Sequence, residues 1–282
     1  MLRNPNRKPI YFTIIIDLKG SRTNFVDQEA TNSFISYFVR KLNAEFIMDI
    51  GESTFQQKDG DSIMIVLQEG MEALVYRIYQ FCNSLYYRSE FQEMAVTKMI
   101  PGKHLAFYFS VGVGTVDTNI NQLNNVDVVN GSSISRATEG ITLVKRIVDN
   151  QVPTPQFSFK KSPFKLLINT TSALNTQPSA DAITGLFYLL YEKILNTKSK
   201  RFGYALLYPE RQISNINLAH ELAEKYKMSS FNVDYSDPIQ RAQVSSKVSV
   251  MLAPVKKEPV ILIQNAIVNG LLNIKEELVQ QL

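Results

Sequence analysis

The sequence predicts a mixed α/β fold for the first half of the chain and an all-helical fold for the second half. In the first half, short apolar and β-branched segments alternate with segments whose apolar residues recur every three or four positions. An Asp-Gly pair lies between two apolar segments there, which is typical of a β-hairpin. Residues 183–282 show helical periodicity only.

Composition excludes several classes of protein. The chain has 282 residues, of which 45% are hydrophobic, so it is long enough to bury a sizeable core and is not disordered. A single cysteine, Cys82, excludes an internal disulfide framework, and its position on an apolar helical stripe predicts a packed side chain. The first apolar segment is too short for a membrane span, so we expect a cytoplasmic protein with no membrane partner. The positive excess is small, 30 Lys+Arg against 26 Asp+Glu, and gives no strong footprint for nucleic acid.

The first elements follow from local patterns. Residues 10–16 form a continuous apolar segment, which predicts a central strand buried on both faces and ending at Asp17. Asp27 is expected to cap the helix that follows. Residues 46–56 and 62–67 are expected to form a hairpin around the turn Gln57-Lys-Asp-Gly-Asp.

Three further elements complete the first half: a helix over residues 71–91, a strand over 105–116 and a helix capped by Ser132 or Ser133. The resulting order, β-α-β-β-α-β-α, is that of the ferredoxin-like split βαβ arrangement, with an antiparallel sheet and helices on one face. In that arrangement the end of the first strand lies close to the hairpin turn.

Residues 150–180 are rich in Pro, Ser, Thr and Asn and predict a connection, with one strand over 164–168. We therefore expect an α/β domain over residues 1–155, followed by a linker and helical domain over 156–282. The helices expected in the second domain cover residues 183–195, 218–226, 238–252 and 259–282.

Asp17 and Asp61 are the sharpest candidates for chemistry. Mg²⁺ takes a few carboxylate oxygens and keeps water and phosphate oxygens in its other positions, so two aspartates on neighbouring strands predict a site for Mg²⁺ or Mn²⁺. The loop Lys19, Gly20 and Ser21 could direct backbone N–H groups at a triphosphate. In the alternative reading, Asp17 only ends a strand and Asp61 only belongs to a turn.

Four segments carry a resemblance to a known family. IIIDLKGSR, KDGDSIMIVL, FSVGVGTVDT and GSSISRATEGITLVKR resemble the successive motifs of nucleotidyl-cyclase palm domains. Their order and spacing more closely resemble the SatD family of bacterial proteins, which combines a cyclase-like N-terminal domain with a helix-turn-helix-like C-terminal region. The resemblance covers nearly the whole chain.

The resemblance implies roles for individual residues. Asp17 lies where cyclases place their first metal-binding aspartate, and Asp61 lies where the hairpin supplies the second. Lys145 resembles the lysine with which diguanylate-cyclase-type helices reach a triphosphate, and the alternative is a solvated lysine beside an apolar stripe. Cyclase relatives complete their sites across a homodimer, so the resemblance also implies a homodimer.

The chain departs from the family pattern at the residues that stabilise the transition state. The asparagine and arginine that mammalian-type cyclases place four and eight residues after a helix glycine are absent, because Gly131 leads to Ser135 and Glu139. Arg136 or Arg146 would have to supply that charge. Nucleotide and metal binding are therefore better supported than turnover.

The C-terminal region offers a candidate surface for DNA. The segment LAHELAEKYKMSS resembles the first helix and turn of a helix-turn-helix, and QVSSKVSVML resembles its recognition helix, although a longer connection separates them. The residues placed to contact phosphates or bases are Arg241, Ser245, Ser246 and Lys247. The alternative is a helical packing domain with no DNA contact.

Three functions therefore compete. The leading hypothesis is a nucleoside triphosphate- and metal-binding, cyclase-like protein that carries out nucleotidyl transfer or cyclisation. The second is a non-catalytic DNA-binding or nucleotide-sensing regulator. The third is a structural module without a small-molecule ligand.

Overall fold

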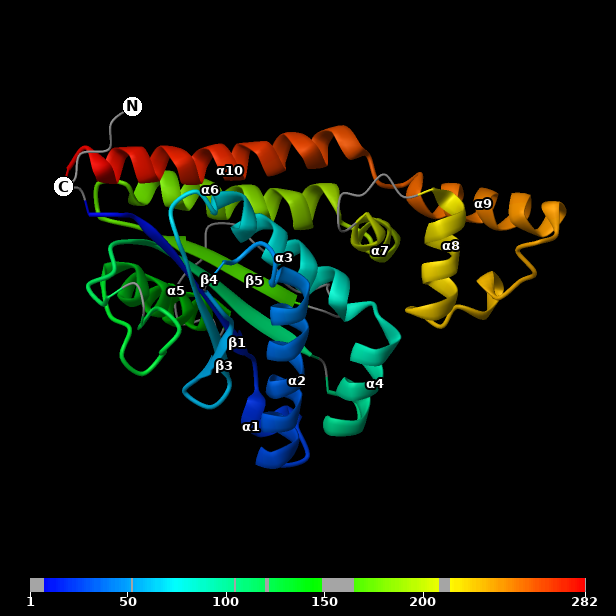
Figure 1. The fold of residues 1–282 in the computed structure, drawn as a ribbon, viewed down its shortest axis with the longest axis horizontal. Coiled ribbons are helices and arrows are strands. Elements are labelled where there is room, and N and C mark those ends of the chain that lie inside the picture. The colour runs from blue at the N-terminus through cyan, green and yellow to red at the C-terminus, as the bar shows by residue number, and fades with distance from the viewer. Residues whose placement is uncertain are drawn as a thin grey trace.

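The computed structural model describes residues 8–51, 53–103, 105–119, 122–148, 165–207 and 214–281. Over these residues the fold is mixed α/β, with one sheet covered by helices and a helical lobe projecting beyond it (Figure 1). The strands are β1 (Tyr11–Leu18), β2 (Gln56–Lys58), β3 (Ser62–Leu67), β4 (Ala106–Gly114) and β5 (Lys165–Thr171). Their order across the sheet is β2-β3-β1-β4-β5, and β5 alone runs parallel to its neighbour.

Helices lie both before and after β5 in the chain. Those before β5 are α1 (Ser21–Asn24), α2 (Gln28–Phe46), α3 (Glu72–Tyr86), α4 (Ser89–Lys98) and α5 (Ser132–Val148). Those after it are α6 (Gln177–Tyr188), the π-helix η2 (Leu189–Ile194), α7 (Lys198–Leu206), α8 (Asn215–Glu224), the 3₁₀ helix η3 (Ser229–Phe231), α9 (Pro238–Leu252) and α10 (Lys257–Val279).

Strand β1 lies at the centre of the sheet and is buried on both faces, as its unbroken apolar segment predicts. Phe12, Ile14 and Ile16 alternate onto the face that forms the larger core with α2, α3, α6 and α10. Tyr11 and Ile15 point to the opposite face and pack with α5. The expectation that helices cover one face only is therefore wrong, because α5 covers the second.

Glycines in β4 bring α5 close to the sheet. A Cβ on Gly112 would lie 2.1 Å from the carbonyl oxygen of Ser133 and 2.3 Å from the backbone nitrogen of Ala137. A Cβ on Gly114 would lie 2.4 Å from Ser132 Oγ. The Gly-Val-Gly sequence is therefore a packing feature that lets the helix backbone touch the strand.

The predicted helix start at Asp27 is confirmed, since its side chain accepts a hydrogen bond from Ala30 N at 2.6 Å. The predicted strand over residues 46–56 is wrong. Helix α2 extends to Phe46, and Asn43 then holds the returning chain through two hydrogen bonds to the backbone of Phe55, at 2.8 and 2.9 Å. The predicted helix over 71–91 is divided into α3 and α4.

The second half of the chain does not pack as one separate helical unit. Strand β5 joins the sheet, and α6 and α10 contribute to the larger core beside α3. Lys275 of α10 pairs with Glu72 of α3 at 2.9 Å, with both side chains largely buried. A separate core forms only where the end of α7 meets α8, η3 and α9. The packing thus departs from the predicted division at residue 155.

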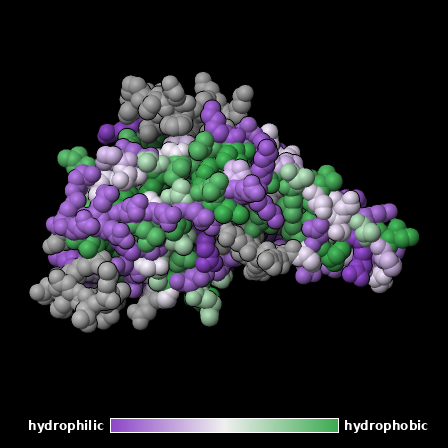
Figure 2. Space-filling model, turned by 90° about the horizontal axis from the view of Figure 1, so that it is seen from above, coloured by the Kyte–Doolittle hydropathy of each residue, from purple (hydrophilic) through white to green (hydrophobic). Residues whose placement is uncertain are grey.

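The face above α6 and α10 carries mixed hydropathy, with hydrophobic residues gathered near its middle (Figure 2). Ile261 and Leu262 of α10 are exposed. In the part of the chain that the structure describes, no helix combines the length and the apolar character needed to cross a membrane.

Candidate functional site

Asp17 occupies the end of β1, on the face of the sheet covered by α5. Its register partners are Ser62 on β3 and Tyr108 on β4. Ser62 Oγ donates a hydrogen bond to Asp17 Oδ2 at 2.8 Å, and Lys145 Nζ pairs with Asp17 Oδ1 at 2.9 Å. Both carboxylate oxygens are therefore held from different elements, which fixes the orientation of the side chain.

Asp61 ends the hairpin turn immediately before β3 and lies beside the end of β1. Its carbonyl oxygen accepts a hydrogen bond from Leu18 N at 3.2 Å, and its carboxylate accepts one from Ser21 Oγ. The turn itself is built by Asp59 and Gly60, both with positive φ, 48° and 83°. Asp17 and Asp61 are 44 positions apart in the chain, and the hairpin brings them to the same edge of the sheet.

The loop after β1 turns sharply at Gly20. This residue has φ 68° and ψ 31°, and a Cβ there would lie 2.7 Å from the side-chain amide nitrogen of Asn24. The Gly20 carbonyl oxygen accepts hydrogen bonds from Thr23 N and Asn24 N at 3.0 and 2.8 Å, which starts α1. This turn places the Ser21 hydroxyl against Asp61.

Two lysines meet over one aromatic ring beside Asp17. Lys19 Nζ lies 5.6 Å from the centroid of the Tyr108 ring, and Lys145 Nζ lies 5.7 Å from the same centroid. Tyr108 is buried, and it is directly opposite Asp17 on the neighbouring strand. The site therefore combines two carboxylates, two ammonium groups and an aromatic surface.

The protonation of Asp17 reflects opposing effects. Burial raises the pKa of its carboxyl above the usual 3.8, and the charge of Asp61 adds to this. The hydrogen bonds from Lys145 and Ser62 and the charge of Lys145 lower the pKa, but burial outweighs them. The ammonium group of Lys145 thus compensates only part of the cost of burying this carboxylate.

The donor set suits a divalent ion that keeps other ligands. Asp17 and Asp61 supply carboxylate oxygens, and no third His, Cys, Asp or Glu completes a metal-binding group with them or at any other place in the described ranges. Two carboxylates are the usual protein contribution to Mg²⁺ that also binds phosphate oxygens. The Asp17–Lys145 pair can open, because the Lys145 side chain is 44% exposed and the Asp17 side chain only 6%.

Neither predicted source of additional positive charge contacts Asp17 or Asp61 among the described interactions. Arg136 donates a hydrogen bond to the carbonyl oxygen of Val113, which pairs with Phe12 near the other end of β1. Five strand positions separate Phe12 from Asp17, roughly 16 Å along the strand. The expected role of Arg136 is therefore corrected, and Arg146 is exposed beside Lys145 without a contact to Asp17 among the described interactions.

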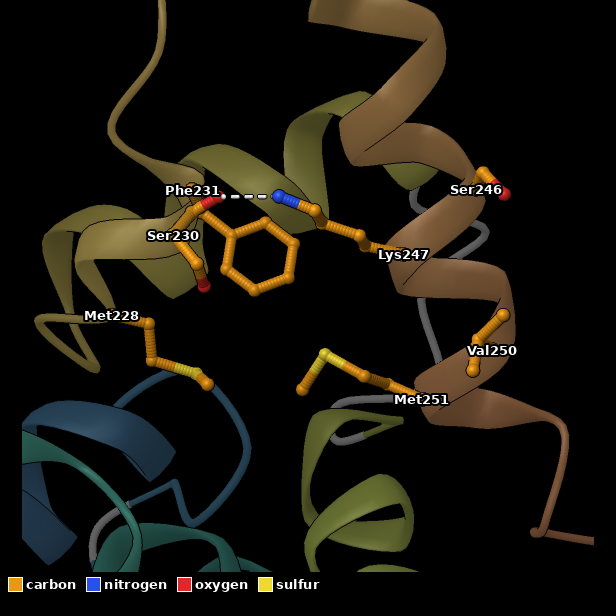
Figure 3. Close-up of a pocket in the computed structure, with 7 residues that line it drawn as sticks. All are labelled: Met228, Ser230, Phe231, Ser246, Lys247, Val250 and Met251. Atoms are coloured by element: carbon orange, nitrogen blue, oxygen red, sulfur yellow. Dashed lines mark hydrogen bonds between the residues drawn. The ribbon is translucent and has the colours of Figure 1, made fainter.

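The candidate DNA-contact residues lie on α9 in the projecting lobe. Ser245 is engaged by α8, since Asn215 Nδ2 donates to its carbonyl oxygen at 3.2 Å. Lys247 Nζ donates to the Ser230 carbonyl oxygen at 3.3 Å (Figure 3). Arg241 and Ser246 are exposed. Half of this set therefore also makes contacts within the lobe.

A cavity of about 460 Å³ lies between η3 and α9, lined by Lys247 and Ser246 among others. Met228, Phe231 and Met251 point into it (Figure 3). This lining is chiefly apolar, unlike the charged surface on which DNA phosphates are bound.

Sequence reasoning missed two residues at the site. Ser62 and Tyr108 are the strand partners of Asp17, but a partner is identified only once the register is known. The hairpin turn predicts Ser62 indirectly, whereas no local signal marks Tyr108.

Comparison with known proteins found no matching family model, no matching curated protein and no matching solved structure. The geometry around Asp17 is therefore what bears on function. Two carboxylates from one sheet edge, with lysines beside them, can bind a metal ion together with the phosphates of a ligand.

Proposed function

We propose that this protein binds a nucleoside triphosphate with Mg²⁺ or Mn²⁺ at Asp17 and Asp61, in a cyclase-like α/β domain. The observation that carries the proposal is that the segments carrying Asp17 and Asp61 are hydrogen-bonded to each other at one edge of the sheet, with the Lys145 ammonium 2.9 Å from Asp17 Oδ1. An arrangement that holds both signs of charge is suited to a metal ion and a polyphosphate together.

The topology supports a ferredoxin-like, cyclase-like assignment of this domain. Strands β1 to β4 follow the element order β-α-β-β-α-β, and all neighbours in the series β2-β3-β1-β4 are antiparallel. The additional parallel strand β5 and helix α5 extend that arrangement. The resemblance to the SatD family remains part of this proposal.

Each residue at the site has a proposed task. Asp17 and Asp61 hold the metal, and Ser62 and Ser21 fix the two carboxylates by hydrogen bonding. Lys145 would exchange its bond to Asp17 for the triphosphate, and Lys19 would add a second positive charge. The loop Lys19, Gly20 and Ser21 would line the phosphates.

The reaction that such a site would support is nucleotidyl transfer. The proton of a ribose 3′-hydroxyl would pass to solvent water as its oxygen bonds to the α-phosphorus, the bond from that phosphorus to the bridging oxygen would break, and pyrophosphate would leave. A bound divalent ion supplies Lewis acidity and charge neutralisation. The chain would supply orientation through Asp17 and Asp61 and charge compensation through Lys145.

A homodimer and a cytoplasmic location belong to the same proposal. The exposed Ile261 and Leu262 on α10 offer an apolar surface on which a second copy could pack. The rival proposal, a non-catalytic DNA-binding or nucleotide-sensing regulator, uses Arg241 and Ser246 on the exposed surface of α9.

Thermal unfolding of the full chain with each nucleoside triphosphate, with and without Mg²⁺ or Mn²⁺, tests the proposal. A ligand at a hundredfold excess over its dissociation constant should raise the unfolding free energy by about 2.7 kcal/mol. We expect this metal-dependent shift to be absent in Asp17→Asn and Asp61→Asn. The matched control is Asp59→Asn in the same turn, whose exposed side chain lies outside the site.

The control distinguishes a specific site from a general charge effect. Asn tolerates the positive φ at position 59, so the substitution removes one negative charge without strain. A shift retained in Asp59→Asn and lost in the other two variants supports the proposal. No shift with any triphosphate, or an equal shift in all variants, contradicts it.

A further inference from the structure

A second cavity lies far along the chain from Asp17, where the helical lobe joins the rest of the molecule. It has a volume of about 220 Å³ and lies between the end of η2, the start of α7 and the junction of α9 with α10. Figure 1 shows α7 beside that junction. The chain enters the lobe through one side of this cavity and leaves it through the other.

Three lysines from these three segments line the cavity: Lys193, Lys200 and Lys256. Among the described residues, no carboxylate lines the cavity or forms an ion pair with any of the three lysines. Lys200 Nζ donates to the neutral side chain of Asn196, at 3.1 Å from its Oδ1. The described lining therefore carries positive charge and no negative charge, beside apolar side chains.

A buried arginine contacts the lining residue Leu195 without itself lining the cavity. Arg201 is 7% exposed, and its guanidinium donates to the carbonyl oxygens of Leu195 and Tyr191 at 2.8 and 3.1 Å. Leu195 is itself part of the cavity lining. Buried charges in proteins are normally paired, yet among the described residues no carboxylate lies within ion-pair distance of Arg201.

The amino end of α10 also favours a negatively charged ligand at the cavity. Lys256 and Pro259, at the beginning of this 23-residue helix, line the cavity, and no side chain caps the helix there. The amino end of a long helix carries a partial positive charge and favours anions. Glu258, in the same turn, is exposed and does not line the cavity.

We propose that this cavity is an anion site for a compact phosphate group, bound by Lys193, Lys200 and Lys256. Its volume lies below the roughly 300–1,000 Å³ of pockets for drug-sized ligands, so it fits a phosphate or pyrophosphate group better than a whole nucleotide. The group could be a free inorganic anion or the phosphoryl group of a larger ester. The proposal does not depend on the function assigned to Asp17.

The position of the cavity gives binding a structural consequence. Gly203 of α7 packs against the junction, since a Cβ on it would lie 2.7 Å from Val255 Cγ2 and 3.0 Å from the Met251 carbonyl oxygen. An anion bound both by Lys193 and Lys200, where the chain enters the lobe, and by Lys256, where it leaves, would hold these two connections together. We therefore expect it to reduce opening of the connection between the lobe and the sheet domain.

Calorimetric titration of the full chain with inorganic pyrophosphate, and separately with glycerol phosphate, tests the site. The experiment uses EDTA and a constant ionic strength set with chloride. We expect saturable binding that weakens by about tenfold or more in Lys193→Gln/Lys256→Gln. The matched control, Lys198→Gln/Lys257→Gln, removes two neighbouring lysines that do not line the cavity and should weaken binding by less than about threefold.

A third variant separates this cavity from the site at Asp17. Binding that persists in Lys145→Gln supports the proposal, whereas binding lost in Lys145→Gln and retained in Lys193→Gln/Lys256→Gln overturns it. Absence of saturable binding, or equal weakening in the two lysine pairs, also overturns it. The tighter of the two ligands identifies the source of the phosphate group. Slower hydrogen exchange over residues 195–200 and 253–259 with ligand would confirm the expected clamping.

Discussion

Replacing Lys145 by methionine is expected to destabilise the metal-free protein by about 1–2 kcal/mol at neutral pH. Lys145 Nζ lies 2.9 Å from Asp17 Oδ1, and methionine keeps the apolar stem while removing the charge. Asp17 would then be a buried carboxylate that keeps its hydrogen bond from Ser62 but has lost its ammonium partner. The change in the free energy of unfolding therefore measures how much the Lys145 ammonium offsets the cost of burying the Asp17 carboxylate.

The magnitude follows from the unequal burial of the two partners. At an effective dielectric constant of about 20, two unit charges 2.9 Å apart attract by about 6 kcal/mol before desolvation is subtracted. Exposed pairs contribute about 0–1 kcal/mol net, and removing one partner of a fully buried pair costs about 3–5 kcal/mol. With Asp17 6% and Lys145 44% exposed, the expected loss lies between these limits. It corresponds to a decrease in Tm of roughly 2–8 °C.

The loss of stability in Lys145→Met is expected to depend on pH. Burial raises the pKa of the Asp17 carboxyl in the folded protein above its value of 3.8 in the unfolded chain. Protonation of Asp17 therefore stabilises the folded state, and this contribution is fully present below pH 3.8. The contribution is lost as pH rises through the folded-state pKa. Removing Lys145 raises the folded pKa further. The stability difference between wild type and Lys145→Met should therefore grow as pH rises above the wild-type folded pKa, and shrink towards low pH.

Chemical unfolding with EDTA across this pH range is the assay, with Arg146→Met as the control for loss of one exposed positive charge on the same helical turn. Combining Asp17→Asn with Lys145→Met should restore most of the loss, because the buried charge is then absent. Equal stability of Lys145→Met, Arg146→Met and wild type at neutral pH would refute the reasoning. A loss that does not change with pH would refute it as well.

Three other outcomes test the packing and the rival function. Gly112→Ala should destabilise the protein by about 1–3 kcal/mol or more in chemical unfolding, because the new Cβ would meet the backbone of α5. Gly185→Ala in α6 should instead stabilise the protein by about 0.5–1 kcal/mol, because its new Cβ would meet nothing within 4 Å. Equal effects would contradict the close approach of α5. Cys82 is buried and burial raises the pKa of its thiol, so a thiol reagent should leave it unmodified in the native protein and modify it fully in denaturant. If α9 binds DNA, log affinity should fall linearly with log salt, with a slope reduced by about one in Arg241→Ala. No binding at low salt would exclude that function.

Local patterns predicted much of the sheet. The apolar segment that ends at Asp17 became the central strand β1, and the segment after Gly60 became β3 over Ser62–Leu67. These two predictions place Asp17 and Asp61 at one edge of the sheet, because β3 pairs antiparallel with β1 and so begins where β1 ends. The helix over residues 238–252 also has the predicted limits.

Long-range packing decided the features that local patterns missed. The side of the sheet that α5 covers depends on Gly112 and Gly114, whose small size is informative only once the neighbouring helix is known. The backbone of Phe55 is held by the side chain of Asn43, which favours a returning loop over the strand expected there. Helix α10 has an apolar stripe compatible with any partner, and its pairing with α3 through Lys275 and Glu72 has no local signal.

Joint binding of a divalent metal and a nucleoside triphosphate by Asp17 and Asp61 is the proposal on which the assigned function depends. The most direct measurement is equilibrium binding of Mn²⁺, detected by electron paramagnetic resonance, in the presence of a non-hydrolysable triphosphate. Wild type, Asp17→Asn, Asp61→Asn and Asp59→Asn would be compared. We expect nucleotide-dependent Mn²⁺ binding in wild type and Asp59→Asn and its loss in the other two variants. Equal binding in all four proteins, or none in the wild type, would contradict it.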